Sequence, residues 1–259
     1  MNRLFKGILT AVLLLSLGAG AVAAGTPLSG PQILATMDEA MGAQSKVMTQ
    51  NMTIVAANGQ ERTREMQMWS RQVQNGDEML AKFLAPADVR GTGILLKDDD
   101  MWLYLPALGK TRRVAAHAKK GSFMGSDLTF DDMEQLGSRG FTPFYRADLL
   151  GEGEAVDSEC FVLELVPLEA DNAFSRLKVW VDKSVFLPRQ IEYYDETGQL
   201  QRVLSTYNLS ARAGRWQAER MVMEDLVRGT KTILQIKEVR LDEDLDASLF
   251  TTRSLERGI

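Results

Sequence analysis

Short turn sequences recur along most of this chain, and they constrain its fold more than any other feature. Asn58-Gly59 and Asn75-Gly76 are strong signals for tight hairpin turns. Thr197-Gly198, Ala213-Gly214 and Arg228-Gly229 are turn-like breaks in the second half. Strands joined by such short turns predict an antiparallel meander, because parallel strands need long crossover connections.

The segments between these turns have the length and pattern of strands, and no linker or repeat divides them. The expected strands cover 47–56, 61–73, 79–84, 93–97, 101–105, 159–166, 177–182, 189–194, 200–209, 215–226 and 230–241. Before them, Pro31 and apolar residues at three- and four-residue steps predict an amphipathic helix that ends at Gly42. We therefore expect one mainly β domain.

The first residues resemble a cleavable signal peptide. Arg3 and Lys6 precede an apolar run from Ile8 to Leu17, and the small residues Ala21-Val22-Ala23 follow. A retained membrane anchor is the alternative, but a spanning helix needs about 20 apolar residues. We expect residues 1–24 to be removed, and residues 25–259 to work as a single periplasmic domain.

Composition argues against several classes of function. The net charge of −5 argues against binding nucleic acid, which requires a basic surface. The only histidine, His117, has no partner in sequence that would mark a catalytic or metal site, and the only cysteine, Cys160, cannot form an intramolecular disulfide. Asp131 and Asp132 could support acid–base chemistry, but they also suit the positive end of a helix. We expect no enzyme activity, no cofactor and no metal.

The segment 107–150 is long and irregular for a hairpin connection, and long insertions of this kind often act as lids. Thr129 lies three residues before Asp132, which predicts a capped short helix that runs to Gln135, with Gly137 behind it. We expect the lid to be the segment from Gly121 to Gly137. Its expected apolar side comprises Phe123, Met124, Phe130, Met133 and Leu136.

Thirteen methionines are present, which is many for 259 residues. Methionine is flexible and polarizable, and it suits surfaces that adapt to apolar partners of varied shape. Several pairs at alternate strand positions would place large side chains on one face, either around a lipid cavity or in an ordinary core under the first helix. The expected cavity residues are Met66, Met68, Met79, Trp102, Tyr104, Met221 and Met223.

A basic cluster stands out in this acidic chain. It could contact anionic lipid headgroups or an acidic patch of a partner, or it could be a solvated loop. Its members are Lys110, Arg112, Arg113, Lys119 and Lys120.

Several segments in the same order resemble the family of outer-membrane lipoprotein-sorting proteins, distant relatives of the periplasmic lipoprotein carrier LolA. They are APADVRGTG at 85–93, WLYLPALGK at 102–110, RRV at 112–114, SFMGSDLTFDD at 122–132, and the stretches 179–188 and 245–251. The resemblance implies a strongly curved antiparallel sheet forming a half-open barrel, with an N-terminal helix and a short lid helix on its concave side.

The resemblance also implies a hydrophobic cavity that shields lipid chains. We therefore expect a non-catalytic periplasmic carrier of lipid or lipoprotein cargo, with transient membrane contact. An inner-membrane transporter of the RND or lipoprotein-release type is the expected partner. The alternative function is an accessory or sensor protein of an RND-type transporter, using the same fold.

Overall fold

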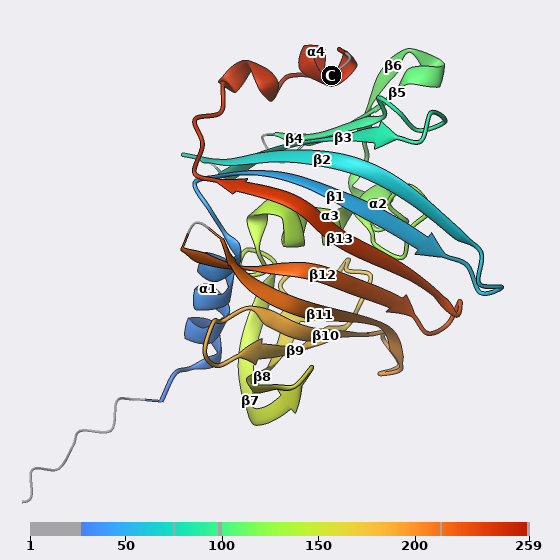
Figure 1. The fold of residues 1–259 in the computed structure, drawn as a ribbon. Helices are drawn as coiled ribbons and strands as arrows, with labels where there is room; N and C mark the ends of the chain where they lie inside the picture. The colour runs from blue at the N-terminus through green and yellow to red at the C-terminus, as the bar shows by residue number, and fades with distance from the viewer. Residues whose placement is uncertain (1–26, 75, 98–99, 213, 258–259) are drawn as a thin grey trace, which may run out of the picture.

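The computed structural model describes residues 27–74, 76–97, 100–212 and 214–257, and its centre is one curved sheet of 13 antiparallel strands. The expected signal peptide lies outside these residues. In space the strands follow the order β6-β5-β4-β3-β2-β1-β13-β12-β11-β10-β9-β8-β7. The sheet curls around an interior that holds helices α1 and α3 (Figure 1). The two edge strands do not pair with each other, so the barrel stays half-open, as expected.

Eleven of the strands lie where the meander was expected, and the two edge strands β6 and β7 were not expected. The strands are β1 (Ser45–Val55), β2 (Glu61–Val73), β3 (Gly76–Ala85), β4 (Gly93–Lys97), β5 (Asp100–Leu105), β6 (Lys110–Val114), β7 (Tyr145–Ala155), β8 (Ser158–Pro167), β9 (Arg176–Asp182), β10 (Pro188–Tyr194), β11 (Leu200–Arg212), β12 (Arg215–Asp225) and β13 (Thr230–Leu241). The turn at Asn58-Gly59 sets the register of the first hairpin, in which Val55 faces Glu61 and Gly59 adopts a φ of 82°.

Helix α1 (Gly30–Met41) forms where the apolar spacing predicts it. Ser29 and Gln32 form a capping box at its start, and it ends at Gly42. Its apolar face, Ile33, Leu34 and Met37, is fully buried in the interior of the sheet.

The segment 107–150 contains more regular structure than the sequence suggests. Its start forms the 3-10 turn η1 (Pro106–Leu108), β6 and the short helix α2 (Ala116–Lys119), and its end begins β7. Between them lies the predicted lid helix α3 (Phe130–Glu134), which continues into the π-helix η2 (Gln135–Arg139). The capping box is confirmed: the amide of Asp132 donates to Oγ1 of Thr129 at 3.0 Å, and the amide of Thr129 donates to the Asp132 carboxylate at 2.7 Å.

The C-terminal segment crosses the outer, convex face of the sheet (Figure 1). It contains the 3-10 turn η3 (Ala247–Leu249) and helix α4 (Thr252–Glu256). Phe250 and Leu255 pack there on Leu80 and Leu95 in a second apolar cluster. Among the described residues, none of the helices has the length and apolar content to cross a bilayer.

Candidate functional site

The interior between the concave face and the lid is an apolar cluster with an unusual composition. All twelve methionines of the described residues either belong to it or pack against it. Methionine side chains come from α1, from β1, β2, β3, β5 and β12, and from the lid. A fully aliphatic core of this size would normally use Leu, Ile and Val, which have better-defined rotamers. The methionines therefore make this interior adaptable.

Five of the seven expected cavity residues lie in this interior. Met66, Met68, Met79 and Met223 are buried in it, and Met221 packs against it from β12. Met66 and Met68 are two residues apart on β2, so they share the concave face, and Met68 lies opposite Ala81 of β3.

Trp102 and Tyr104 lie elsewhere, so they do not form one set with the methionines. Both pack with the C-terminal segment in the cluster on the convex face. The alternation along β5 is the reason: Met101 and Leu103 contact the interior, so their neighbours point outward. The two-residue spacing of Trp102 and Tyr104 shows that they share one face of β5. It does not show whether that face is concave or convex.

The expected apolar residues of the lid all contact the interior. Phe123, Phe130 and Met133 are buried, and Met124 and Leu136 pack against the cluster. The Phe123 ring lies 6.0 Å from that of Phe83 on β3 and 5.4 Å from that of Phe130, measured between ring centroids. The lid is therefore closed, and its own side chains fill the interior.

A glycine allows the lid to approach the sheet closely. A β-carbon at Gly137 would lie 3.1 Å from Sδ of Met79 and 3.2 Å from Cε of Met68. The backbone of η2 thus rests directly on two of the expected cavity methionines.

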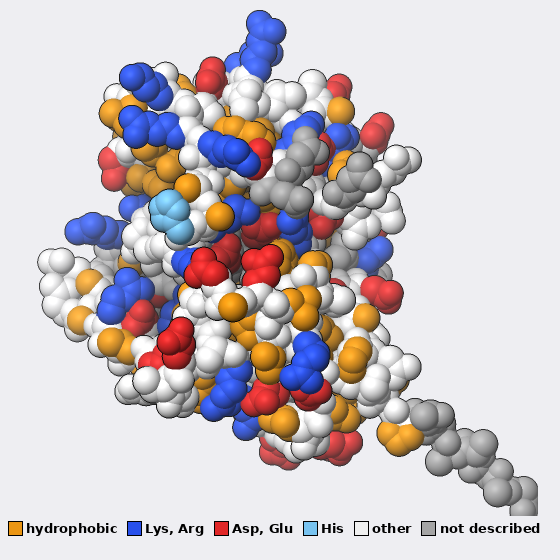
Figure 2. Space-filling model, turned by 180° about the vertical axis from the view of Figure 1, so that it is seen from behind, with side chains coloured by type: hydrophobic (Ala, Val, Ile, Leu, Met, Phe, Trp, Pro, Cys, Tyr) orange, Lys and Arg blue, Asp and Glu red, His pale blue; other side chains and the backbone are white. Residues whose placement is uncertain are grey.

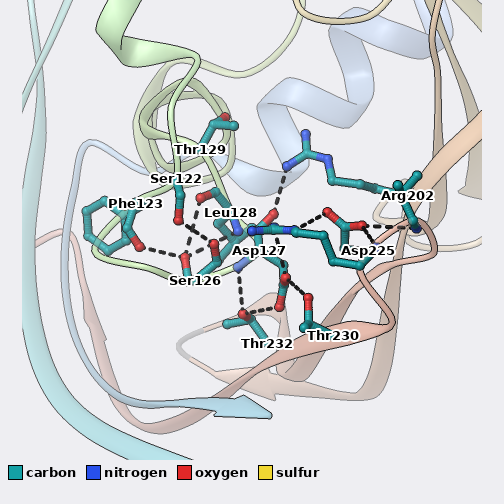
Figure 3. A network of polar contacts seen from close by, with 12 residues as sticks. Ser122, Phe123, Ser126, Asp127, Leu128, Thr129, Arg202, Asp225, Thr230 and Thr232 are labelled. Carbon is teal, nitrogen blue, oxygen red and sulfur yellow. Dashed lines mark hydrogen bonds and ion pairs between the residues drawn. The ribbon is translucent and has the colours of Figure 1, made fainter. Parts of the chain in front are cut away.

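A buried ion pair fastens the lid helix to the sheet. Nη1 of Arg202 on β11 lies 2.8 Å from Oδ2 of Asp132, and only 6% and 5% of the two side chains is exposed. The same Nη1 donates to the backbone oxygen of Asp127 at 2.7 Å (Figure 3). Burial lowers the pKa of Arg202, but the charge and hydrogen bond of Asp132, together with Tyr193 and Asp225, outweigh this effect, and the pKa is raised.

Asp127 forms the second half of this fastening. Its buried carboxylate accepts hydrogen bonds from Thr230 at 2.5 Å and from Thr232 at 2.7 Å, and it pairs with Arg228 at 3.0 Å (Figure 3). We call the whole set the polar latch; it comprises Asp127, Asp132, Arg202, Arg228, Thr230 and Thr232. It ties the lid to β11, to β13 and to the turn before β13.

The remaining lid contacts are also polar. Arg64 of β2 donates to the backbone oxygen of Met124. Glu134 is buried and pairs with Lys119 at 3.1 Å and with Arg139 at 3.0 Å. Behind the lid, the Asp38 carboxylate of α1 accepts the amide of Thr142 at 2.7 Å. Burial raises the pKa of Asp38 despite these hydrogen bonds. The side of the lid that faces the sheet is thus apolar, and hydrogen bonds and ion pairs hold its edges.

The five basic residues do not form one patch. Lys110, Arg112 and Arg113 lie exposed on edge strand β6. Lys119 is held by Glu134, and Lys120 pairs with Asp171. These last two line a polar hollow of about 410 Å³ together with Asp131, Glu134 and Glu169. On the side of the molecule opposite to Figure 1, acidic side chains gather near the middle of the face (Figure 2).

A smaller, mostly apolar groove opens between the end of α1, the lid and the sheet. Met48, Met221 and Ile236 form its floor, Leu136 of the lid forms one wall, and Trp216 lies at its rim with 45% of its surface exposed. Its free volume is about 70 Å³.

Sequence reasoning missed the polar latch. Arg202 and Asp132 lie 70 residues apart, and Asp132 already had a local role as a helix-capping residue. A charged residue at an inward position of β11, between Leu200 and Leu204, was the available signal.

Three comparisons place these features among known proteins. A family model described as "Uncharacterized protein" matches residues 75–257. No curated protein matches the chain.

Solved structures resemble the chain over most of its length. An outer membrane lipoprotein-sorting protein domain from Vibrio parahaemolyticus is 30% identical with a TM-score of 0.80, over 88% of this chain and 98% of that one. A DUF1329 family protein from Desulfovibrio piger is 30% identical with a TM-score of 0.81, over 87% and 97%. A LolA superfamily protein from Nitrosomonas europaea shares the fold at 24% identity and a TM-score of 0.73, over 88% and 100%.

Proposed function

Because this chain belongs to the family of outer-membrane lipoprotein-sorting proteins and has the LolA superfamily fold, we propose that it is a non-catalytic periplasmic carrier. It shields the acyl chains of a lipid or lipoprotein between the concave face of the sheet and the lid. Its partners are that cargo, the membranes it contacts briefly, and an inner-membrane transporter.

The gathering of all described methionines in the interior is the observation that carries this proposal. Acyl chains vary in length and bend, so a surface that holds them gains from side chains that change rotamer at low cost. Apolar burial is non-directional, and such an interior accepts chains without reading their chemistry in detail.

The packing of the lid supports the proposal, because its apolar side chains contact the surface on which an acyl chain would lie. Phe123, Phe130 and Met133 occupy the interior, so an incoming chain would replace their contacts with similar ones of its own. The free energy needed to open the lid is then mainly that of breaking the polar contacts at its edge, above all the Arg202–Asp132 pair. The free energy of loading is therefore a balance between acyl burial and the latch.

Lipid extraction and native mass spectrometry of the purified protein test the proposal. We expect bound or exchangeable acyl lipid, with uptake reduced in Met68→Gln and Met79→Gln, which place amides in the interior. Trp102→Gln is the matched control, because that side chain lies on the convex face. A wild-type protein that takes up no lipid under any condition would refute the carrier function.

The second candidate is an accessory or sensor protein of an RND-type transporter. The hairpin tip between β12 and β13 favours it, since Leu226 and Val227 are 51% and 66% exposed there. Co-purification with such a transporter that is lost in Leu226→Ser/Val227→Ser, yet unchanged in Met68→Gln, would favour this function over the carrier.

A further inference from the structure

The groove at the end of α1 contains one positively charged group among apolar walls. Lys46 lies on β1 two residues before Met48, so both side chains face the groove from the same strand face. Its Nζ donates to the backbone oxygen of Met41 at 2.8 Å. Within the part of the chain that the structure describes, Lys46 forms no ion pair.

The surroundings of Lys46 leave its charge uncompensated. The charge of Arg215 is also positive, and it adds to the effect of burial in lowering the pKa of Lys46 to about 8. Asp242 is the acid near this end of the groove, and it contacts Arg215 at 3.7 Å and the amide of Gln44 at 3.0 Å. An ammonium in apolar surroundings is normally paired, because desolvation of an isolated charge is costly.

We propose that this groove binds an acyl chain that carries an anionic head group, with the head group held by Lys46. The inference rests on the proposed carrier function and specifies its ligand. Lys46 supplies up to two further N–H donors to a carboxylate or phosphate, and Arg215 adds positive potential beside it. Further into the groove, the acyl chain would contact Met48, Met221 and Ile236.

The small free volume of the groove links head-group binding to the lid. A volume of about 70 Å³ is far below the roughly 300–1,000 Å³ of typical ligand pockets, so a long chain enters only with a shift of the walls. Leu136 is the wall that belongs to η2, next to the glycine that rests on Met68 and Met79. A chain anchored at Lys46 therefore displaces the lid at Leu136, four residues beyond Asp132 of the polar latch.

Isothermal titration with three twelve-carbon amphiphiles tests the proposal. Dodecanoate and dodecyl phosphate carry an anionic head, whereas dodecanol carries none. We expect the wild type to prefer at least one anion over dodecanol by about tenfold, the equivalent of about 1.4 kcal/mol for a charge-assisted contact. Preference for dodecanoate would indicate fatty acids as the source, and preference for dodecyl phosphate would indicate phospholipids.

Substitutions test whether Lys46 causes the preference for an anionic amphiphile over dodecanol. Lys46→Gln should abolish it and leave dodecanol binding within about twofold. Lys237→Gln, on the outward face of β13 in an ion pair with Glu65, should change neither. The wild-type comparison needs no variant, so it holds even if Lys46→Gln folds poorly.

Equal binding of all three amphiphiles by the wild type, or a preference that survives Lys46→Gln, overturns the inference and leaves the carrier function intact. Failure of every amphiphile to bind refutes the carrier function itself.

Discussion

The Arg202–Asp132 pair offers the sharpest test of how the lid is held. The perturbations are Asp132→Asn, which keeps an acceptor for the Thr129 amide, and Arg202→Met, which keeps the length of the side chain. Each removes one charge and leaves the other buried, since 6% or less of either side chain is exposed. Breaking a buried pair on one side typically costs about 3–5 kcal/mol.

The surroundings of Arg202 place Asp132→Asn near the lower end of that range. The guanidinium keeps its bond to the Asp127 carbonyl and its positions 4.5 Å from the Phe174 ring centroid and 4.6 Å from that of Tyr193. We expect Asp132→Asn to lower the free energy of unfolding by about 3 kcal/mol, and Arg202→Met by about 3–5 kcal/mol. The double variant leaves no unpaired charge, so it should lose at least about 2 kcal/mol less than the sum of the two.

Urea unfolding followed by intrinsic fluorescence gives these free energies, and hydrogen exchange shows where they act. Amides of residues 121–140 should exchange faster in both single variants, while those of β8 to β10 keep their protection. Arg212→Met is the control: its pair with Glu219 is exposed, so the loss should stay below about 1 kcal/mol. Additivity of the two substitutions within about 0.5 kcal/mol, or unchanged exchange in the lid, would show that this pair does not hold the lid.

Three further predictions follow from the lid and the two faces of the sheet. Burial, and then the charge of Glu134, raise the pKa of Asp131 to about 6, so its ionised form destabilises the fold at pH 7. Asp131→Asn should therefore stabilise the protein by about 1 kcal/mol at pH 7, after allowance for partial exposure, and by nothing below about pH 4, as thermal unfolding at both pH values would show. Gly140→Ala should cost about 1–3 kcal/mol and speed exchange of the residue 141 amide, because its φ is 69° and a β-carbon would lie 2.4 Å from Cγ of Asp38. Trp102→Ala should lower stability by about 2 kcal/mol but leave lipid uptake unchanged, and reduced uptake would contradict the placement of this residue on the convex face.

The sequence predicted the local features of this fold well, because turn and capping signals act over a few residues. Asn58-Gly59 lies between β1 and β2 as expected, and Thr129 caps α3 through the predicted contact with Asp132. Edge strands β6 and β7 were missed. Lys110–Val114 carries two adjacent arginines and little apolar alternation, because an edge strand with exposed side chains needs none.

The candidate site was predictable in its chemistry but not in its geometry. Methionine content indicated an adaptable apolar interior, and five of the seven expected residues lie there. Which face a strand turns to the interior depends on register across the whole sheet, so Trp102 and Tyr104 were assigned to the wrong one. Contacts such as Arg202 to Asp132 join residues 70 positions apart, so a charged residue at an inward strand position indicates a buried partner but does not identify it.

The methionine interior also gives the lid a protective role. A thioether oxidises to a polar sulfoxide, which would disrupt the apolar contacts of this interior. With the lid closed, Met66 and Met79 are 0% and 1% exposed, so oxidants reach them only while the lid is open. In the proposed carrier, lid opening during loading would expose these methionines to oxidants. Peroxide treatment followed by peptide mass spectrometry should show sulfoxide forming at Met66 and Met79 faster in Asp132→Asn than in the wild type. The polar latch would thus limit methionine oxidation as well as the entry of the proposed cargo.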